Sequence, residues 1–166
     1  VTGLVGSEMC IRDRSNSRIL ISGPSGSGKE TCARFIHSLS NRMNHPFVVA
    51  ACASLSNQMV DQLLFGFNDS KNKNDAKSLF EQANNGTIYF NEICDLPLNT
   101  QAKLINVIQD QSFYKYGSNK KIKIDIRVIA GTSYDTNEAV KNGILREDLY
   151  YRLSVVPIFI PSLNSR

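Results

Sequence analysis

Short apolar runs alternate with longer segments of helical spacing along the chain from residue 18 onward. The apolar runs are bounded by turn residues and predict strands at residues 18–22, 46–51, 87–91, 126–130 and 155–160. Helical spacing predicts helices at residues 28–40, 58–65, 76–84, 99–111 and 137–142. Near-continuous apolar strands fit a sheet that is covered on both faces. The pattern therefore predicts an α/β fold in which a parallel sheet lies between layers of helices.

Two segments interrupt this alternation. Residues 68–75 (NDSKNKND) are polar and rich in turn formers, which predicts a surface loop. Residues 113–123 (FYKYGSNKKIK) place a Gly-Ser-Asn turn between alternating aromatic and basic residues, which predicts a small hairpin. The lysines of this hairpin could contact DNA or a partner. A solvated hairpin is the favoured interpretation, because the charges alternate with apolar residues at strand period.

The composition is that of one soluble globular domain, with 166 residues of which 42% are hydrophobic and 20% are charged. A net charge of +4 without a block of like charge does not by itself indicate a nucleic-acid-binding protein. The 4 cysteines lie far apart and form no CxxC pair, so neither a zinc site nor a disulfide framework is indicated. Because no apolar run approaches the ~20 residues that cross a bilayer, we expect a cytoplasmic protein without a membrane partner.

The segment GPSGSGKE at residues 23–30 has the glycine and lysine placement of a phosphate-binding loop. Glycines let backbone N–H groups wrap phosphates, the following helix offers its N-terminus to negative charge, and Lys29 reaches the terminal phosphates. An apolar strand precedes the segment and a helical pattern follows it, as the motif requires. The alternative is an ordinary Gly-Ser turn. Glu30 occupies the position where a generic loop has the Ser or Thr that contacts magnesium.

A second apolar strand ends in an acid at residues 87–92 (TIYFNE). This order places a carboxylate at the tip of a sheet strand, beside the phosphate loop. In nucleotide hydrolases such a glutamate orients and activates the attacking water, so Glu92 is the candidate base. Taken alone, a Glu in this position would be a solvated strand end. His37 and His45 have no nucleophile arranged beside them and are predicted to be structural or surface residues.

Several stretches together resemble one family. They are GPSGSGKE, PFVVAACA, NNGTIYFNEICDLPLNTQAKLINVIQ, IDIRVIAGTS and ILREDLYYRLSVVPIFIPSL. In this order they resemble the AAA+ ATPase core of bacterial enhancer-binding response regulators, the sigma-54-interaction domain. Their sequences are most similar to those of the NtrX-type nitrogen regulators. The resemblance implies a three-layer P-loop NTPase core at residues 18–166 that stops before the helical lid. Residues 7–14 (SEMCIRDR) resemble translated sequencing adaptor, so residues 1–14 are expected to be a non-native leader.

The resemblance also implies roles for individual residues. The nucleotide loop would consist of Gly23, Ser25, Gly26, Ser27, Gly28, Lys29, Glu30 and Thr31. Asn91 and Glu92 would form the Walker B pair, with Asn91 holding hydrated magnesium through water, and Ser133 would stand at the sensor I position. Arg146 and Arg152 would act on a neighbour's phosphates across a ring interface, in a hexamer or heptamer. Without the resemblance, these arginines would be interpreted as solvated helix charges.

The chain departs from the family in ways that affect function. Between Phe65 and Phe80 the GAFTGA loop that grips the sigma factor is absent, so remodelling of sigma-54 polymerase is not assigned. Asn91 replaces an acid, which loses a charge-assisted hydrogen bond of about 1.5–3 kcal/mol. Ala51 stands where relatives carry an Asn that switches the catalytic Glu, and Ser133 replaces the usual sensor Asn. Binding of ATP should survive these changes better than turnover.

The leading hypothesis is an ATP-binding AAA+ domain of a two-component transcription regulator that oligomerises in response to nucleotide or phosphorylation and hydrolyses Mg²⁺-ATP weakly. DNA binding would belong to a helix-turn-helix domain outside this chain. The alternative is a pseudo-ATPase, in which bound nucleotide sets the geometry of the assembly without useful turnover. An unrelated P-loop kinase or motor is a third option, which the REDLYYRL segment disfavours.

Overall fold

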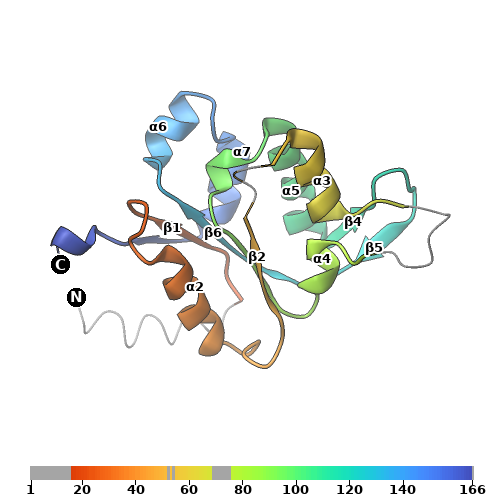
Figure 1. The fold of residues 1–166 in the computed structure, drawn as a ribbon, viewed down its shortest axis with the longest axis horizontal. Helices are drawn as coiled ribbons and strands as arrows, with labels where there is room; N and C mark the ends of the chain where they lie inside the picture. The colour runs from red at the N-terminus through yellow and green to blue at the C-terminus, as the bar shows by residue number, and fades with distance from the viewer. Residues whose placement is uncertain (1–15, 52, 54, 69–75, 166) are drawn as a thin grey trace.

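A twisted parallel sheet forms the centre of the molecule (Figure 1). The structure is a computed structural model that describes residues 16–51, 53, 55–68 and 76–165. The predicted leader at residues 1–14 and most of the predicted loop at residues 68–75 lie outside the described residues. Across the sheet the strands follow the order β2 (Phe47–Ala50), β3 (Thr87–Phe90), β6 (Arg127–Thr132), β1 (Ile19–Ser22) and β7 (Val156–Phe159).

The helices connect these strands as the alternating pattern predicts. They are α2 (Lys29–Ser38), α3 (Asn57–Phe65), α4 (Leu79–Gln82), α5 (Leu98–Asp110), α6 (Thr136–Lys141) and α7 (Glu147–Leu153), with short 3-10 turns η1 (Ile93–Asp95) and η2 (Leu163–Ser165). The helix predicted at residues 76–84 is shorter, because Ser78 caps α4 in a capping box with Glu81. Spacing did not predict α7, since its buried stripe consists of only Leu149 and Leu153. No helix in the described part of the chain is long and apolar enough to span a membrane.

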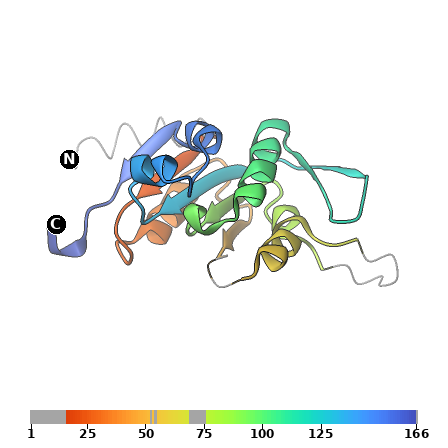
Figure 2. The same ribbon diagram turned by 90° about the horizontal axis from the view of Figure 1, so that it is seen from above.

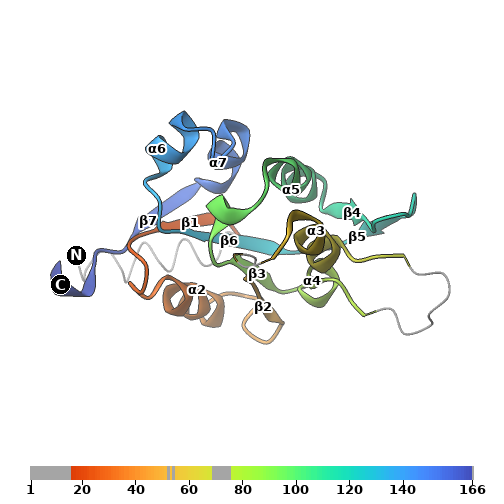
Figure 3. The same ribbon diagram turned by 45° about the horizontal axis from the view of Figure 1, so that its top comes forward.

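Helices cover both faces of the sheet (Figure 3). On one face, Ile19 and Ile21 of β1 pack against α2 in a cluster that includes Ala33 and Ile36. On the other face, Leu20 belongs to the larger core that α3, α4, α5 and α7 share. The alternation along β1 follows from strand geometry, in which successive side chains point to opposite faces. The predicted fold class, a parallel sheet between helix layers, is confirmed.

The predicted hairpin lies at one end of the molecule, with η2 at the other (Figure 2). It consists of β4 (Ser112–Tyr114) and β5 (Lys121–Lys123), which pair antiparallel with Phe113 opposite Ile122. Phe113 is buried, and its ring lies 5.6 Å from the ring of Phe80 and 6.3 Å from that of Phe65. This aromatic cluster anchors the hairpin to α3 and α4.

Three strands present their carboxyl ends at the same edge of the sheet. Ser22 at the end of β1 is in register with Thr132 at the end of β6, and Phe90 of β3 pairs with Ala130 of β6. The residues that follow these strands are Gly23, Asn91 and Ser133. In open parallel sheets, ligands bind in the crevice beyond the carboxyl ends of the strands. The topology therefore brings the predicted site residues from three separate segments to one edge.

His37 of α2 is a buried structural residue, as the sequence predicts. Its exposed fraction is 7%. Nε2 lies 3.0 Å from the His45 carbonyl oxygen, which can only accept, so Nε2 carries the proton and donates. Nδ1 therefore accepts a hydrogen bond from the Thr87 hydroxyl at 2.9 Å. Burial lowers the pKa of His37, with further lowering by the nearby charges of Arg127, His45 and Arg34, although the bond to His45 opposes the shift.

We expect the protein to lose stability as the pH falls below about 6.5, the ordinary pKa of histidine. Below that value the unfolded chain binds a proton that folded His37 resists, so the free energy of unfolding decreases towards acid. The contribution of His37 is complete above this pH. Urea unfolding between pH 5 and 8 measures the slope. His37→Gln should flatten it, whereas the control His45→Gln, at an exposed histidine, should reduce it only slightly, because the charge of His45 is a minor cause of the shift; an unchanged slope in His37→Gln would contradict the assignment.

Candidate functional site

The segment between β1 and α2 forms an open loop whose shape depends on glycine. Gly26 has φ 74° and Gly28 has φ 90°, which is the left-handed region that L side chains rarely adopt. Gly28 also caps the N-terminus of α2. A Cβ atom at Gly23 would collide with the carbonyl oxygen of Ile160. The loop therefore presents backbone N–H groups beside a helix N-terminus, an arrangement that favours phosphate.

Lys29 is the first residue of α2 and lies against its own loop. Its Nζ donates to the carbonyl oxygens of Gly23 at 2.8 Å and Pro24 at 2.9 Å. Burial lowers the pKa of Lys29, and the negative charge of Glu92 partly opposes that shift. The loop carbonyls thus satisfy the ammonium group here. To hold a phosphate, Lys29 would exchange these carbonyl oxygens for phosphate oxygens.

A cavity of about 510 Å³ opens beside the loop. It is lined by Ser25, Gly26, Gly28, Lys29, Glu30, Thr31, Asn91, Glu92, Asp95, Ser133 and Tyr134. Its size lies in the range of small-molecule and cofactor sites. Most of the residues predicted for nucleotide binding therefore surround one cavity. Gly23 lies at the base of the loop and Ser27 is buried beneath it, so neither lines the cavity.

Glu92 follows β3 and faces Ser133, which follows β6. One carboxylate oxygen of Glu92, Oε2, accepts hydrogen bonds from the backbone N–H and the hydroxyl of Ser133, both at 2.7 Å. The other oxygen, Oε1, is buried and has no hydrogen-bond partner among the described residues. Among the described residues, Ser133 therefore supplies both hydrogen-bond donors that Glu92 Oε2 receives.

The acidic residues of the cavity fit a hydrated magnesium ion better than a closed metal cage. The described residues contain no cluster of three or more histidine, cysteine or acidic side chains placed to hold a metal. Glu30 is an ion-pair partner of Arg34, with Nη2 at 2.9 Å from Oε1. Asn91, Glu92 and Asp95 line the cavity with oxygen atoms, which magnesium prefers. Magnesium at such sites keeps several waters and is held largely by the substrate phosphates.

Two cavity residues were missed by sequence reasoning. Asp95 lies in η1, and burial raises the pKa of its carboxyl, with the charge of Glu92 as a further cause. Tyr134 directly follows Ser133. Because both residues lie within four positions of a predicted site residue at a strand end, inspection of the residues after β3 and β6 could have found them.

Arg146 and Arg152 lie away from this cavity. In the part of the chain that the structure describes, neither side chain lines it. Arg146 caps the start of α7, where its Nε and Nη2 each donate to the Asp148 carboxylate at 3.0 Å. Arg152 lies in the last turn of the same helix. Their predicted action on a nucleotide would therefore require a cavity other than their own.

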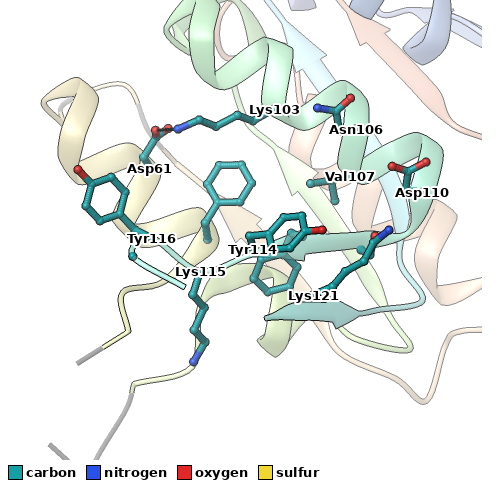
Figure 4. Close-up of a pocket in the computed structure, with 13 residues that line it drawn as sticks. Asp61, Lys103, Asn106, Val107, Asp110, Tyr114, Lys115, Tyr116 and Lys121 are labelled. Atoms are coloured by element: carbon teal, nitrogen blue, oxygen red, sulfur yellow. Dashed lines mark hydrogen bonds and ion pairs between the residues drawn. The ribbon is translucent and has the colours of Figure 1, made fainter. Parts of the chain in front are cut away.

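A second cavity of about 570 Å³ lies between α3, α5 and the hairpin (Figure 4). Its floor is aromatic, and one wall carries an ion pair between Lys103 and Asp61. Lys115 of the hairpin pairs with Glu81 at 3.3 Å. The charges around the cavity are thus of both signs, which does not favour a polyanion such as DNA. This arrangement supports the interpretation of the lysine-rich segment as a solvated hairpin.

Comparison with known proteins identifies the family of the chain. The family model of the Sigma-54 interaction domain matches residues 7–159. The nitrogen assimilation regulatory protein NtrX of Azorhizobium caulinodans is 43% identical over 152 residues, which cover 92% of this chain and 34% of that protein. The regulatory protein AtoC of Escherichia coli is 42% identical over 157 residues, again covering 92% of this chain and 34% of that protein.

Among solved structures, this chain is similar to NtrX from Brucella abortus in complex with ATP. The TM-score is 0.90 with 37% sequence identity, over 99% of this chain and 38% of that chain. The chain therefore spans about a third of the length of the curated relatives described above.

Proposed function

We propose that this chain, which belongs to the Sigma-54 interaction domain family, is the ATP-binding and ATP-hydrolysing domain of a transcription regulator that assembles with copies of itself. The observation that carries the proposal is the cavity in which the glycine loop, Lys29, Glu92 and Ser133 meet. Its relatives NtrX and AtoC are regulatory proteins, and the NtrX structure from Brucella abortus holds ATP.

In this proposal the loop N–H groups and Lys29 bind the phosphates of ATP. Gly26 and Gly28 shape the loop, Ser27 is buried within it, and Ser25 and Thr31 line the cavity beside it. The positive charge of Lys29 opposes the negative charge of the terminal phosphates. Asn91 would hold a water of hydrated magnesium, and the ion would neutralise charge on the phosphates.

Glu92 would act as the general base on the attacking water. Its position after β3 places the carboxylate in the cavity that also contains Lys29. Arg146 or Arg152 of a neighbouring copy would meet the charge that develops on the transferred phosphoryl group. Hydrolysis would then depend on assembly into a ring, which we expect to be a hexamer or heptamer.

The remaining partners follow from the same proposal. Contact with DNA would belong to a further domain of the regulator, and the activity would take place in the cytoplasm. The segment between α3 and α4 has no GAFTGA sequence, so we do not propose remodelling of sigma-54 polymerase. A pseudo-ATPase is the second candidate, because Asn91 replaces the usual acid and Ala51 the usual switch residue.

The proposed binding of ATP by the loop and Lys29 is tested by ATP titration of the protein and its Lys29→Ala variant. We expect Lys29→Ala to weaken ATP affinity by roughly ten- to hundredfold, the effect of losing one hydrogen bond to a charged group. Calorimetry measures both affinities. The control is Lys121→Ala, at an exposed lysine of the hairpin, which should bind ATP as the wild type does. Equal affinities in all three proteins would refute the proposed site.

A further inference from the structure

The contact between Ser133 and Glu92 leaves the carboxylate poorly placed to act on water. Oε2 already accepts two hydrogen bonds of 2.7 Å from Ser133. Oε1 is buried and has no partner among the described residues. A general base must reach the water proton with a free oxygen at hydrogen-bond distance. In the conformation observed, one oxygen is occupied and the other is inaccessible.

The turn that carries Ser133 is held in place by its neighbour Thr132. The Thr132 hydroxyl oxygen accepts from the backbone N–H of Tyr134 at 3.1 Å, and it lies 3.3 Å from Sγ of Cys94. Thr132 is fully buried. These contacts hold the backbone of the turn, so the backbone N–H of Ser133 is fixed in direction towards Glu92.

The same turn is bonded to the phosphate loop. The backbone N–H of Gly23 donates to the Thr132 carbonyl oxygen at 3.1 Å. The Gly23 carbonyl oxygen in turn accepts from Nζ of Lys29 at 2.8 Å. A continuous series of contacts thus runs from Lys29 through Gly23 and Thr132 to Ser133 and Glu92. A phosphate that binds Lys29 would break its hydrogen bond to the Gly23 carbonyl oxygen, which is the first contact in this series.

We propose that Ser133 is a positioning residue that holds Glu92 in an unproductive position until nucleotide binding releases it. Ala51 has no side-chain donor and cannot hold Glu92 by a side-chain hydrogen bond. The inference rests on the proposed function, because it concerns when Glu92 acts as a base. It differs from a supporting role for Ser133, in which the two hydrogen bonds would aim Glu92 at water and their loss would slow turnover.

Kinetics of Ser133→Ala distinguishes these two roles. The variant keeps the backbone N–H bond but loses the hydroxyl bond, so we expect kcat for phosphate release to rise about tenfold, with ATP affinity within about twofold of wild type. Ser133→Thr keeps a hydroxyl and should restore the wild-type kcat. An unchanged or lower kcat in Ser133→Ala would overturn the inference. The double variant Ser133→Ala/Glu92→Gln should lose the gain, because the gain requires the carboxylate.

A crystal structure of the protein with magnesium and a non-hydrolysable ATP analogue provides a readout that does not depend on turnover. We expect the distance between Ser133 Oγ and Glu92 Oε2 to exceed the hydrogen-bond limit of about 3.5 Å in that complex. An intact contact would overturn the inference even if hydrolysis is measured. If ATP binds but no variant releases phosphate, the proposed hydrolysis fails. The separation in the complex then decides whether Ser133 still responds to nucleotide.

Discussion

Replacement of Glu92 by Gln is expected to lower phosphate release by about 10²- to 10⁴-fold, while ATP affinity stays within about twofold. Gln has the shape of Glu, and its amide oxygen can still accept from Ser133, so the cavity should keep its form. The amide cannot take a proton from water, which removes general-base catalysis. Release of phosphate at saturating Mg²⁺-ATP measures the rate, and calorimetry measures the affinity.

The matched control for this substitution is Asp95→Asn. Asp95 lines the same cavity and carries the same charge, yet it makes no hydrogen bond to Ser133 in the described structure. We expect a much smaller loss of rate than in Glu92→Gln, because the proposed base is intact and only one oxygen donor beside the magnesium position changes from a carboxylate to an amide. If Asp95→Asn lowered the rate of phosphate release as much as Glu92→Gln does, the rate would depend on the negative charge of the cavity and not on Glu92 as a base. Equal rates for wild type and Glu92→Gln would favour the pseudo-ATPase.

The parts of the site that sequence could predict are those encoded within one short segment. Strand β1, the glycine loop and the start of α2 are contiguous, and local rules for glycine, lysine and helix N-termini describe them together. Glu92 was a candidate because it follows an apolar strand and the chain also contains a phosphate loop, and it lines the same cavity as Lys29. The sheet itself follows from apolar strands separated by helical segments.

The hydrogen bonds between Glu92 and Ser133 could not be predicted in this way. The two residues are 41 positions apart in the chain, and they meet only because β3 and β6 are neighbours in the sheet. Strand order is a property of the whole fold. The cavity beside the hairpin has the same origin, since α3, α5 and β4 each supply part of its lining. Local sequence patterns do not determine such contacts between residues that are far apart in the chain.

The arginines of α7 lead to the other large expected effect. Alanine in place of the arginine that supplies the charge, either Arg146 or Arg152, is expected to reduce phosphate release in the assembled protein by about 10³-fold or more, the range for arginines that stabilise phosphoryl transfer from a neighbour. Neither arginine lines the cavity of its own chain in the described structure. ATP affinity should therefore change little, because the glycine loop and Lys29 are untouched. Lys141→Ala, at an exposed cation in the last turn of α6, is the control and should hydrolyse ATP normally.

Mixing two inactive variants tests whether the arginines act between copies. Glu92→Gln lacks the base but keeps both arginines, whereas Arg152→Ala keeps the base. If the arginine acts on a neighbour, mixed assemblies contain interfaces with an intact Glu92 on one side and an intact Arg152 on the other. We expect such mixtures to recover a measurable fraction of the wild-type rate, rising with total protein concentration as assembly proceeds. A mixture no faster than the sum of its components would show that Arg152 does not act across the interface. The corresponding mixture with Arg146→Ala then decides which arginine supplies the charge, because Asp148 must first release Arg146.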